Sequence, residues 1–195
     1  MKRLLLDVNV VLDILLDRRP HAGPACAVWA VLESGQARGW LPAHGLTTIH
    51  YLVARARGKQ SALRAIRLLL SVCQVAVVDD HVIRNALALE WPDLEDAVCA
   101  ASAAAAGCDA IISRGLAGFP GSPVTVLDPR AALTWLSLGS KHAAGHRSRG
   151  RRDFLCASGR ETPSSSAKVG ASSSIEISGH RPAWMPGPQS RKLAR

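Results

Sequence analysis

Short apolar runs alternate along the first 140 positions with longer stretches in which apolar residues recur every three or four positions. The short runs predict strands and the longer stretches predict helices. The expected strands cover residues 4–6, 39–42, 75–80, 108–115 and 123–129, and the expected helices cover 9–15, 25–32, 47–58, 59–71, 81–89, 93–106 and 130–136. Because strands and helices alternate, the pattern predicts an α/β fold, namely a three-layer α/β/α sandwich with a central, mostly parallel sheet of about five strands.

The segment 4–13, LLLDVNVVLD, combines the first strand with the start of the first helix. Its leucine run predicts a buried parallel strand that places Asp7 at the carboxyl edge of the sheet, where open α/β folds bind their ligands. Asn9 is of a residue type that caps helices, and Asp13 lies further along the same helix. The chain therefore opens with an acid at an expected ligand-binding edge.

The apolar periodicity stops near residue 140, and the remainder is rich in Ser, Arg, Gly, Ala and Pro. Such a segment cannot bury enough apolar surface to offset its chain entropy. We therefore expect a domain at 1–139 and a basic, disordered tail at 140–195, whose composition also suits a read-through extension. Residues 1–140 hold 13 Lys and Arg against 12 Asp and Glu, whereas residues 141–195 hold 11 against 3. The net charge of +9 thus belongs mainly to the tail.

The five cysteines are odd in number and form no CxxC pair, which argues against a disulfide framework and against a zinc ribbon. We expect most of them to be small apolar core residues in a reducing compartment. The first strand is too short for a signal peptide, and no apolar stretch reaches the length of a membrane span. These features predict a cytoplasmic protein with no membrane partner.

Two further acids, Asp93 and Asp96, are three positions apart at the start of an alanine-rich helix, so both carboxylates project from one face of its first turn. Carboxylates that converge there with Asp7 repel one another unless a hard cation such as Mg²⁺ or Mn²⁺ lies between them. A cation held in this way suits phosphodiester hydrolysis, because it polarises the phosphate, activates water and stabilises the leaving oxygen.

The chain resembles the PIN domain, specifically the branch near the VapC-type toxins of bacterial toxin–antitoxin pairs, in three segments that occur in the same order: LLLDVNVVLDILLDRRPH, TTIHYLVAR and DLEDAVCAASAAAAGCDAIISRGLAGF. In that branch an Asn and a second Asp follow the opening acid, as Asn9 and Asp13 follow Asp7. The alanine-rich helix of the branch opens with an aromatic residue or Leu between acids, as with Leu94 here. The resemblance covers roughly residues 3–137.

The resemblance implies a metal-dependent endoribonuclease that cleaves RNA by single-metal or two-metal phosphodiester hydrolysis with Mg²⁺ or Mn²⁺. It also implies a homodimer and a small antitoxin protein as partners. Asp7 and Asp96 match the two metal-binding acids of the family, and Asp13 and Asp93 match flanking acids that assist, Asp93 at the metal. Ser113 matches a small hydroxyl residue after the fourth strand, and either Ser113 or the neighbouring Arg is expected near the phosphate.

Gly115 and Gly118 depart from the family, which has Asn or Asp at the first position and Asp at the second. Many relatives also carry a Glu in the third helix, where this chain has Thr48, His50 and Tyr51. The alternative hypothesis is therefore a catalytically degenerate PIN domain that binds RNA or protein, in which acids restored at the two glycines raise metal affinity. A flavodoxin-like nucleotide binder ranks below both, because no Gly-rich loop follows the first strand.

Structural roles are the alternative for several of these residues. Asp93 is a good helix N-cap, and acids in a first turn suit the helix dipole. Asp13 is more simply a solvated residue or a partner of Arg18, and a lone His50 on an apolar helix face is more often packed than catalytic. The remaining alternatives concern a strand exit and helix cap at Asp79 and Asp80, a local cap or pair at Asp109, a chance pair at His142 and His146, and solvated helix faces at Arg55, Arg57, Arg64 and Arg67.

Overall fold

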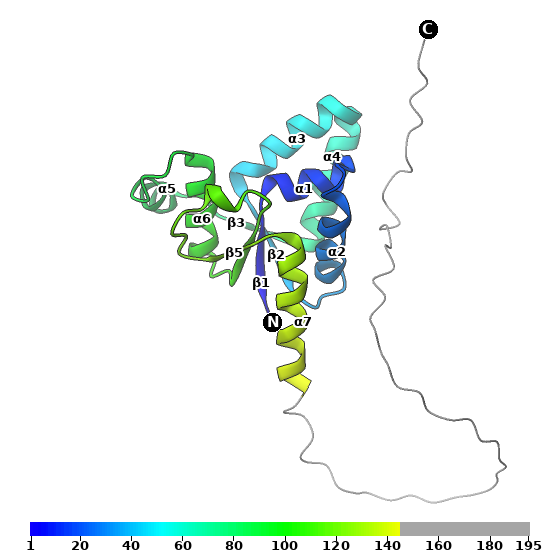
Figure 1. The fold of residues 1–195 in the computed structure, drawn as a ribbon. Coiled ribbons are helices and arrows are strands. Elements are labelled where there is room, and N and C mark those ends of the chain that lie inside the picture. The colour runs from blue at the N-terminus through cyan, green and yellow to red at the C-terminus, as the bar shows by residue number, and fades with distance from the viewer. Residues whose placement is uncertain (145–195) are drawn as a thin grey trace, which may run out of the picture.

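The computed structural model describes residues 1–144, with side chains to residue 138. Its strands are β1 (Arg3–Leu6), β2 (Arg38–Pro42), β3 (Cys73–Ala76), β4 (Ala110–Ile112) and β5 (Thr125–Leu127). Its helices are α1 (Val8–Leu16), α2 (Ala22–Glu33), α3 (Ala43–Arg57), α4 (Lys59–Val72), α5 (Asp80–Leu87), α6 (Leu94–Ala105) and α7 (Pro129–Ala144), with a 3₁₀ turn at Leu116–Gly118. The five strands form one parallel sheet in the order β3-β2-β1-β4-β5. The combination of this sheet with helices confirms the predicted α/β architecture (Figure 1).

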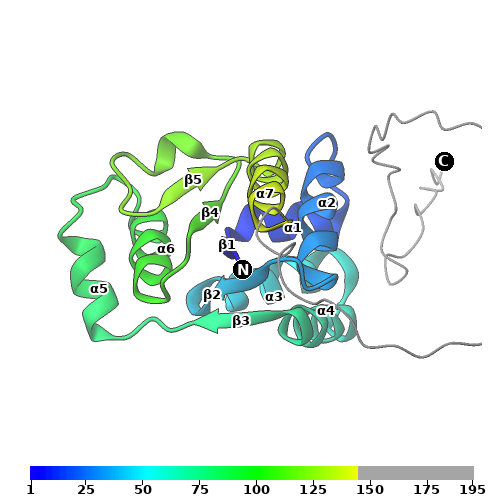
Figure 2. The ribbon, with the colours of Figure 1, turned by 90° about the horizontal axis from the view of Figure 1, so that it is seen from below.

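The sheet is covered on both faces, and this explains why β1 contains an unbroken run of leucines. Leu4 and Leu6 belong to a large core with α1, α2, α3, α4 and α7, whereas Leu5 points to the opposite face and packs with α6 residues. All three side chains are fully buried, because successive residues of a strand face opposite sides of a sheet. Figure 2 shows the three layers, with α5 and α6 on one side of the strands and the other helices on the other side.

The alanine-rich helix α6 lies between the sheet and α5. Ala100 and Ala103 pack toward the sheet, and Ala97 and Ala101 pack toward Val82 and Ala86 of α5. Small side chains on both faces let the helix approach both neighbours closely, as expected from its composition. This packing fixes the position of the first turn of α6, which carries the acids.

The order in which strands are added to the sheet reverses between β1 and β4. From β1 it moves outward through β2 to β3, and later returns to the other side of β1 with β4 and then β5. Open parallel sheets bind ligands at such a switch point, at the carboxyl ends of the strands. Asp7 follows β1 and Ser113 follows β4, so both lie at this point.

The third strand is shorter and earlier than the predicted 75–80. It pairs with β2 in a register that joins Pro42 to Ala76, and it ends there because α3 begins at Ala43 and removes its partner. Val77 is consequently 67% exposed, and Asp79 caps α5 by accepting a hydrogen bond from the Val82 backbone N–H at 2.9 Å. The predicted helix cap at Asp79 is therefore correct, although the predicted strand is misplaced.

Other differences concern helix ends. Helices α2 and α3 begin three to four residues before the first residues predicted for them, 25 and 47, and α7 continues past residue 139 to Ala144. The expected disordered tail otherwise lies outside the described residues, as does the His142 and His146 side-chain pair. Cys73, Cys99 and Cys108 are free thiols, and all three are buried. No helix within residues 1–144 is long and apolar enough to cross a bilayer.

Candidate active site

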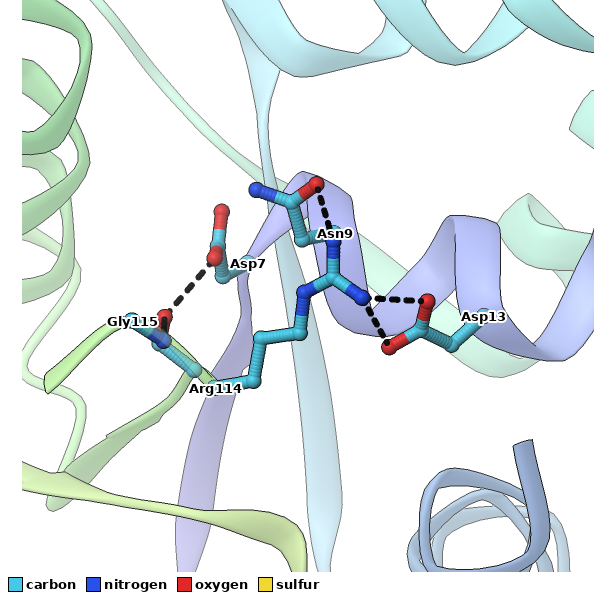
Figure 3. Close-up of polar contacts among 6 residues, drawn as sticks. Asp7, Asn9, Asp13, Arg114 and Gly115 are labelled. Carbon is cyan, nitrogen blue, oxygen red and sulfur yellow. Dashed lines mark hydrogen bonds and ion pairs between the residues drawn. The ribbon is translucent and has the colours of Figure 1, made fainter. Parts of the chain in front are cut away.

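Asp7 joins the end of β1 to the start of α1. Its backbone N–H continues the sheet by donating to the Ile112 carbonyl at 3.0 Å, and its own carbonyl accepts from the first turn of α1. The side chain makes no helix cap and instead accepts a hydrogen bond from Ser113 Oγ at Oδ2, at 2.8 Å (Figure 3). Ser113, which is 1% exposed, in turn accepts the Gly115 backbone N–H at 3.1 Å. The Asp7 carboxylate is therefore held by the Ser113 hydroxyl, which is itself held by the Gly115 backbone N–H.

The protonation of Asp7 reflects two opposing effects. Burial raises its pKa, because the side chain is removed from water. The Ser113 hydrogen bond, the backbone N–H groups of Val8 and Asn9 and the charge of Arg114 act in the opposite direction, and burial is the larger effect. A buried carboxylate of raised pKa at a strand end is a typical feature of functional sites.

Asp96 lies in the first turn of α6, half-buried beside the same sheet edge. Its pKa is raised to about 6, mainly by burial and to a smaller extent by the negative charges of Asp7, Asp93 and Glu95. The repulsion between Asp7 and Asp96 shows that the fold brings the two predicted metal-binding acids into one electrostatic site. Such crowding is relieved by a proton or by a bound cation.

Asp93 has a structural role in addition to its place in this cluster. Its side chain is the N-cap of α6, where Oδ1 accepts the backbone N–H of Glu95 at 2.8 Å and of Asp96 at 3.4 Å. The residue is exposed, and its charge contributes to the raised pKa of Asp96. Of the two roles considered for Asp93, the helix cap is observed directly, and the role at the metal stays a prediction.

Gly118 lies against the Asp96 carboxylate. A Cβ added to Gly118 would overlap Asp96 Oδ2 and would lie 3.0 Å from Asp96 Cγ. A Cβ added to Gly115 would meet only Ser113 Oγ, at an ordinary 3.8 Å. An acid restored at Gly118 would therefore require the Asp96 carboxylate to move, and the expected rise in metal affinity stays a prediction.

Asp13 is neither solvated nor paired with Arg18, in contrast to the simpler sequence interpretation. Its side chain is 2% exposed and forms an ion pair with Arg114, whose Nη1 lies 3.2 Å from Oδ1 and 3.5 Å from Oδ2. Arg114 Nη2 also donates to Asn9 Oδ1 at 3.5 Å (Figure 3). Burial raises the pKa of Asp13, and Arg114 opposes this more strongly than His21 or Arg18. Asp13 thus contacts the loop after β4, and Arg114 lies between it and Asp7.

His44 is the residue that sequence reasoning missed. It lies in the first turn of α3, two residues beyond the end of β2, and both ring nitrogens are buried without a hydrogen-bond partner among the described residues. Burial lowers its pKa, and the charges of Glu95 and Asp7 oppose this, so the ring is neutral at pH 7 and lies near the acids. The position after a strand end, which identified Asp7, also identifies His44. Tyr51, one of the three residues at the place of the family's Glu, lies against Arg55 and is 58% exposed.

The donor set for a metal is small. Within the side chains described, no group of three or more His, Cys, Asp or Glu could hold a metal ion. Mg²⁺, however, is commonly bound by one or two carboxylates, with water and substrate phosphate completing its shell. The two crowded carboxylates of Asp7 and Asp96 fit that mode of binding.

Comparison with known proteins identifies the family of the chain. A sequence model of the PIN domain matches residues 3–117, a segment that contains Asp7, Asp96 and Ser113. The chain belongs to the PIN domain family. No curated protein gives a significant sequence match to this PIN domain.

Solved structures of the same fold come from toxin–antitoxin systems. The PIN domain is similar to a chain of a toxin–antitoxin complex from Klebsiella pneumoniae, with 22% identity, a TM-score of 0.50 and coverage of 64% of this chain and 96% of that one. It is also similar to DNA-bound VapBC from Salmonella typhimurium, with 16% identity, a TM-score of 0.52 and coverage of 66% of this chain and 99% of that one. A third similar structure is VapBC-1 from nontypeable Haemophilus influenzae, with 12% identity, a TM-score of 0.51 and coverage of 66% of this chain and 98% of that one. At these identities the likeness is one of fold.

Proposed function

We propose that this PIN domain is a metal-dependent endoribonuclease of the VapC toxin type, with Mg²⁺ or Mn²⁺ bound by Asp7 and Asp96. One observation carries the proposal: Asp7 and Asp96 come from separate elements and lie close enough for their charges to interact, and burial together with the charges of Asp7, Asp93 and Glu95 raises the pKa of Asp96 to about 6. At neutral pH such a cluster is unfavourable on its own and is stabilised by a divalent cation. Family membership supports the nuclease class.

The residues of the chain would act as follows. Ser113 holds Asp7 through Oδ2, which leaves Oδ1 available as a metal ligand. Asp93 fixes the first turn of α6, so that Asp96 is presented from a rigid element. Gly118 leaves room for the Asp96 carboxylate. A bound cation would polarise the phosphodiester and lower the pKa of an attacking water.

A small antitoxin protein is the partner that we propose, together with a homodimer as the assembly. The support is that the similar structures from Klebsiella pneumoniae, Salmonella typhimurium and Haemophilus influenzae are toxin–antitoxin or VapBC complexes. The full chain is co-expressed with a short open reading frame next to its gene, and the product is analysed by size-exclusion chromatography with light scattering, which reports both co-elution with an antitoxin and the mass of a homodimer. We expect the two proteins to co-elute and the co-eluted complex to show no RNA cleavage.

The second candidate function is a degenerate PIN domain that binds RNA or protein without cutting. It is favoured by a specific observation, the lack of any group of three candidate metal ligands among the described side chains. Gly115 and Gly118 occupy positions where the family has polar residues. This candidate predicts RNA binding that does not depend on a divalent cation.

The deciding experiment is a calorimetric titration of the full chain with Mg²⁺ and Mn²⁺, alongside cleavage of a structured RNA. Asp7→Asn and Asp96→Asn each remove one of the two crowded carboxylates, and both are expected to abolish metal binding and cleavage. Asp80→Asn is the matched control, because Asp80 is an exposed acid paired with Arg84 on α5. Full metal binding in both site variants would refute the assignment, and no binding by the natural chain at millimolar metal would favour the binding module.

A further inference from the structure

Arg114 places a positive charge beside a cluster of carboxylates. A phosphodiester that approaches Asp7 and Asp96 carries a negative charge and is repelled by both acids at short range. The charge of Arg114 is felt by Asp7, since it opposes the rise in the pKa of that residue. A fixed cation at this position reduces the repulsion that the substrate meets.

The contacts of Arg114 hold it in one place. Both Asp13 oxygens accept from Nη1, and Asn9 Oδ1 accepts from Nη2. Asp13 is 2% exposed, whereas Arg114 is 35% exposed, so the carboxylate is the buried anchor and the guanidinium reaches the surface. Burying a carboxylate costs free energy unless the charge is paired. Arg114 supplies that pair for Asp13 while its own guanidinium stays partly in solvent.

These contacts leave part of the guanidinium unused. An arginine has five N–H donors in a fork that matches phosphate oxygens. Asp13 and Asn9 engage Nη1 and one Nη2 hydrogen, and Nε contacts no acceptor among the described residues. Nε lies on the side of the guanidinium that faces Asp7 (Figure 3). The free donors and the carboxylate of Asp7 thus border the same space.

We propose that Asp13 and Asn9 hold Arg114 as a fixed phosphodiester-binding group, and that Asp13 is a positioning residue for Arg114 and not a metal ligand. The choice of a phosphodiester as the ligand rests on the proposed function. Nε–H and the remaining Nη2 hydrogen donate to the two non-bridging oxygens of the phosphate. Arg114 therefore binds substrate, and Asp13 acts through it.

The test observes Arg114 directly. Nε–H signals of the full chain are recorded by ¹H–¹⁵N NMR in EDTA while the ribodinucleotide ApA, which has one phosphodiester, is added to millimolar concentration. Arg114→Lys assigns the signal, and Arg84, whose Nε is already bonded to Asp80 at 2.8 Å, is the internal control. We expect the Arg114 signal to shift with ApA and the Arg84 signal to stay in place. In Asp13→Asn the apparent affinity for ApA at Arg114 is expected to fall at least about tenfold, because an unanchored fork loses its orientation.

Three outcomes would overturn the proposal: no ApA-dependent shift at Arg114, an equal shift at Arg84, or unchanged ApA affinity in Asp13→Asn. A Mg²⁺ titration of Asp13→Asn separates positioning from ligation, since a positioning residue leaves Mg²⁺ affinity unchanged and a metal ligand lowers it as Asp96→Asn does. Because the NMR measurement needs neither metal nor cleavage, a natural chain without nuclease activity refutes the proposed function and still allows Arg114 to be judged. Arg114→Lys also serves here, because it keeps a positive charge beside the buried Asp13 carboxylate, whereas Arg114→Ala would leave that carboxylate without its ion-pair partner.

Discussion

Gly118→Ala is expected to uncouple activity from stability. The new methyl group would lie 3.0 Å from Asp96 Cγ and overlap Oδ2, whereas carbon atoms in good contact are about 3.5–4.0 Å apart. The Asp96 carboxylate must therefore move by roughly 0.5–1 Å or more. A displacement of about 1 Å at a catalytic group commonly costs about 10²-fold in rate, so RNA cleavage is expected to fall by that order and Mg²⁺ affinity with it.

The same substitution should not unfold the protein. Asp96 is half-buried, and the displaced group is the end of a side chain that can rotate toward solvent. Gly118 has no left-handed backbone angle, and alanine at such a position restricts the unfolded chain, which stabilises a protein by about 0.4–1 kcal/mol. The thermal midpoint is thus expected to stay the same or to rise slightly while activity is lost.

Gly115→Ala is the matched control, because it lies in the same loop, keeps the N–H that donates to Ser113, and places its methyl group in ordinary contact at 3.8 Å. The assays are Mg²⁺ calorimetry, cleavage of a structured RNA and thermal denaturation, on full chains in parallel. Equal metal affinity and cleavage in the two variants would refute the claim that space at Gly118 sets the position of Asp96. Gly118→Asp extends the test, since it should weaken the metal site although it adds an acid.

Three other predictions concern the same site. Because the folded pKa of Asp96, about 6, lies above its ordinary value of 3.8, the folded state binds more protons than the unfolded state between these values, so the unfolding free energy of the metal-free chain should fall as pH rises from 4 to above 6. Asp96→Asn should flatten that part of the pH profile and raise the thermal midpoint at pH 7.5; a midpoint lower than that of the natural chain would contradict this. His44→Leu removes two buried nitrogens that lack partners and should raise the unfolding free energy in urea by about 1 kcal/mol, whereas a loss of several kcal/mol would show that the ring is bonded in solution. Ser113→Ala leaves Asp7 and the Gly115 N–H without their partner and should cost about 1–3 kcal/mol in the same assay, with no change in midpoint counting against the hydrogen-bonded arrangement.

The sequence was sufficient for the architecture, because the central strands β1 and β4 have both faces buried and therefore read as unbroken apolar runs. Leu4, Leu5 and Leu6 show this most clearly, and they also place Asp7 at the carboxyl edge. The third strand was misplaced because apolar residues continue after Ala76, where β2 no longer provides a partner. The end of β3 is set by the end of β2, and the pattern of apolar residues within one segment does not show where its partner strand ends.

The candidate site was only partly predictable for a related reason. Asp7 and Asp96 follow from strand ends and helix starts, which are local signals. The pairing of Asp13 with Arg114 depends on how the loop after β4 passes over α1, and the burial of both His44 nitrogens depends on α3 packing beside the acids. The space that Gly118 leaves for Asp96 is a property of two segments in contact, so the same glycine looked in the sequence like a simple loss of an acid.

The polar contacts that complete the site connect distant parts of the chain: Ser113 and Asp7 are 106 positions apart, and Arg114 and Asp13 are 101 positions apart. Contacts of this separation form late, because the entropy of closing a long loop opposes them until the intervening elements are folded. A growing polypeptide on the ribosome that has passed the first turn of α6 therefore already contains Asp7, Asp13, Asp93 and Asp96, but it lacks the Ser113 hydroxyl and the Arg114 guanidinium that organise them. The site is thus assembled only when synthesis has passed β4, and a chain interrupted before that strand carries the acids in an unorganised and inert form.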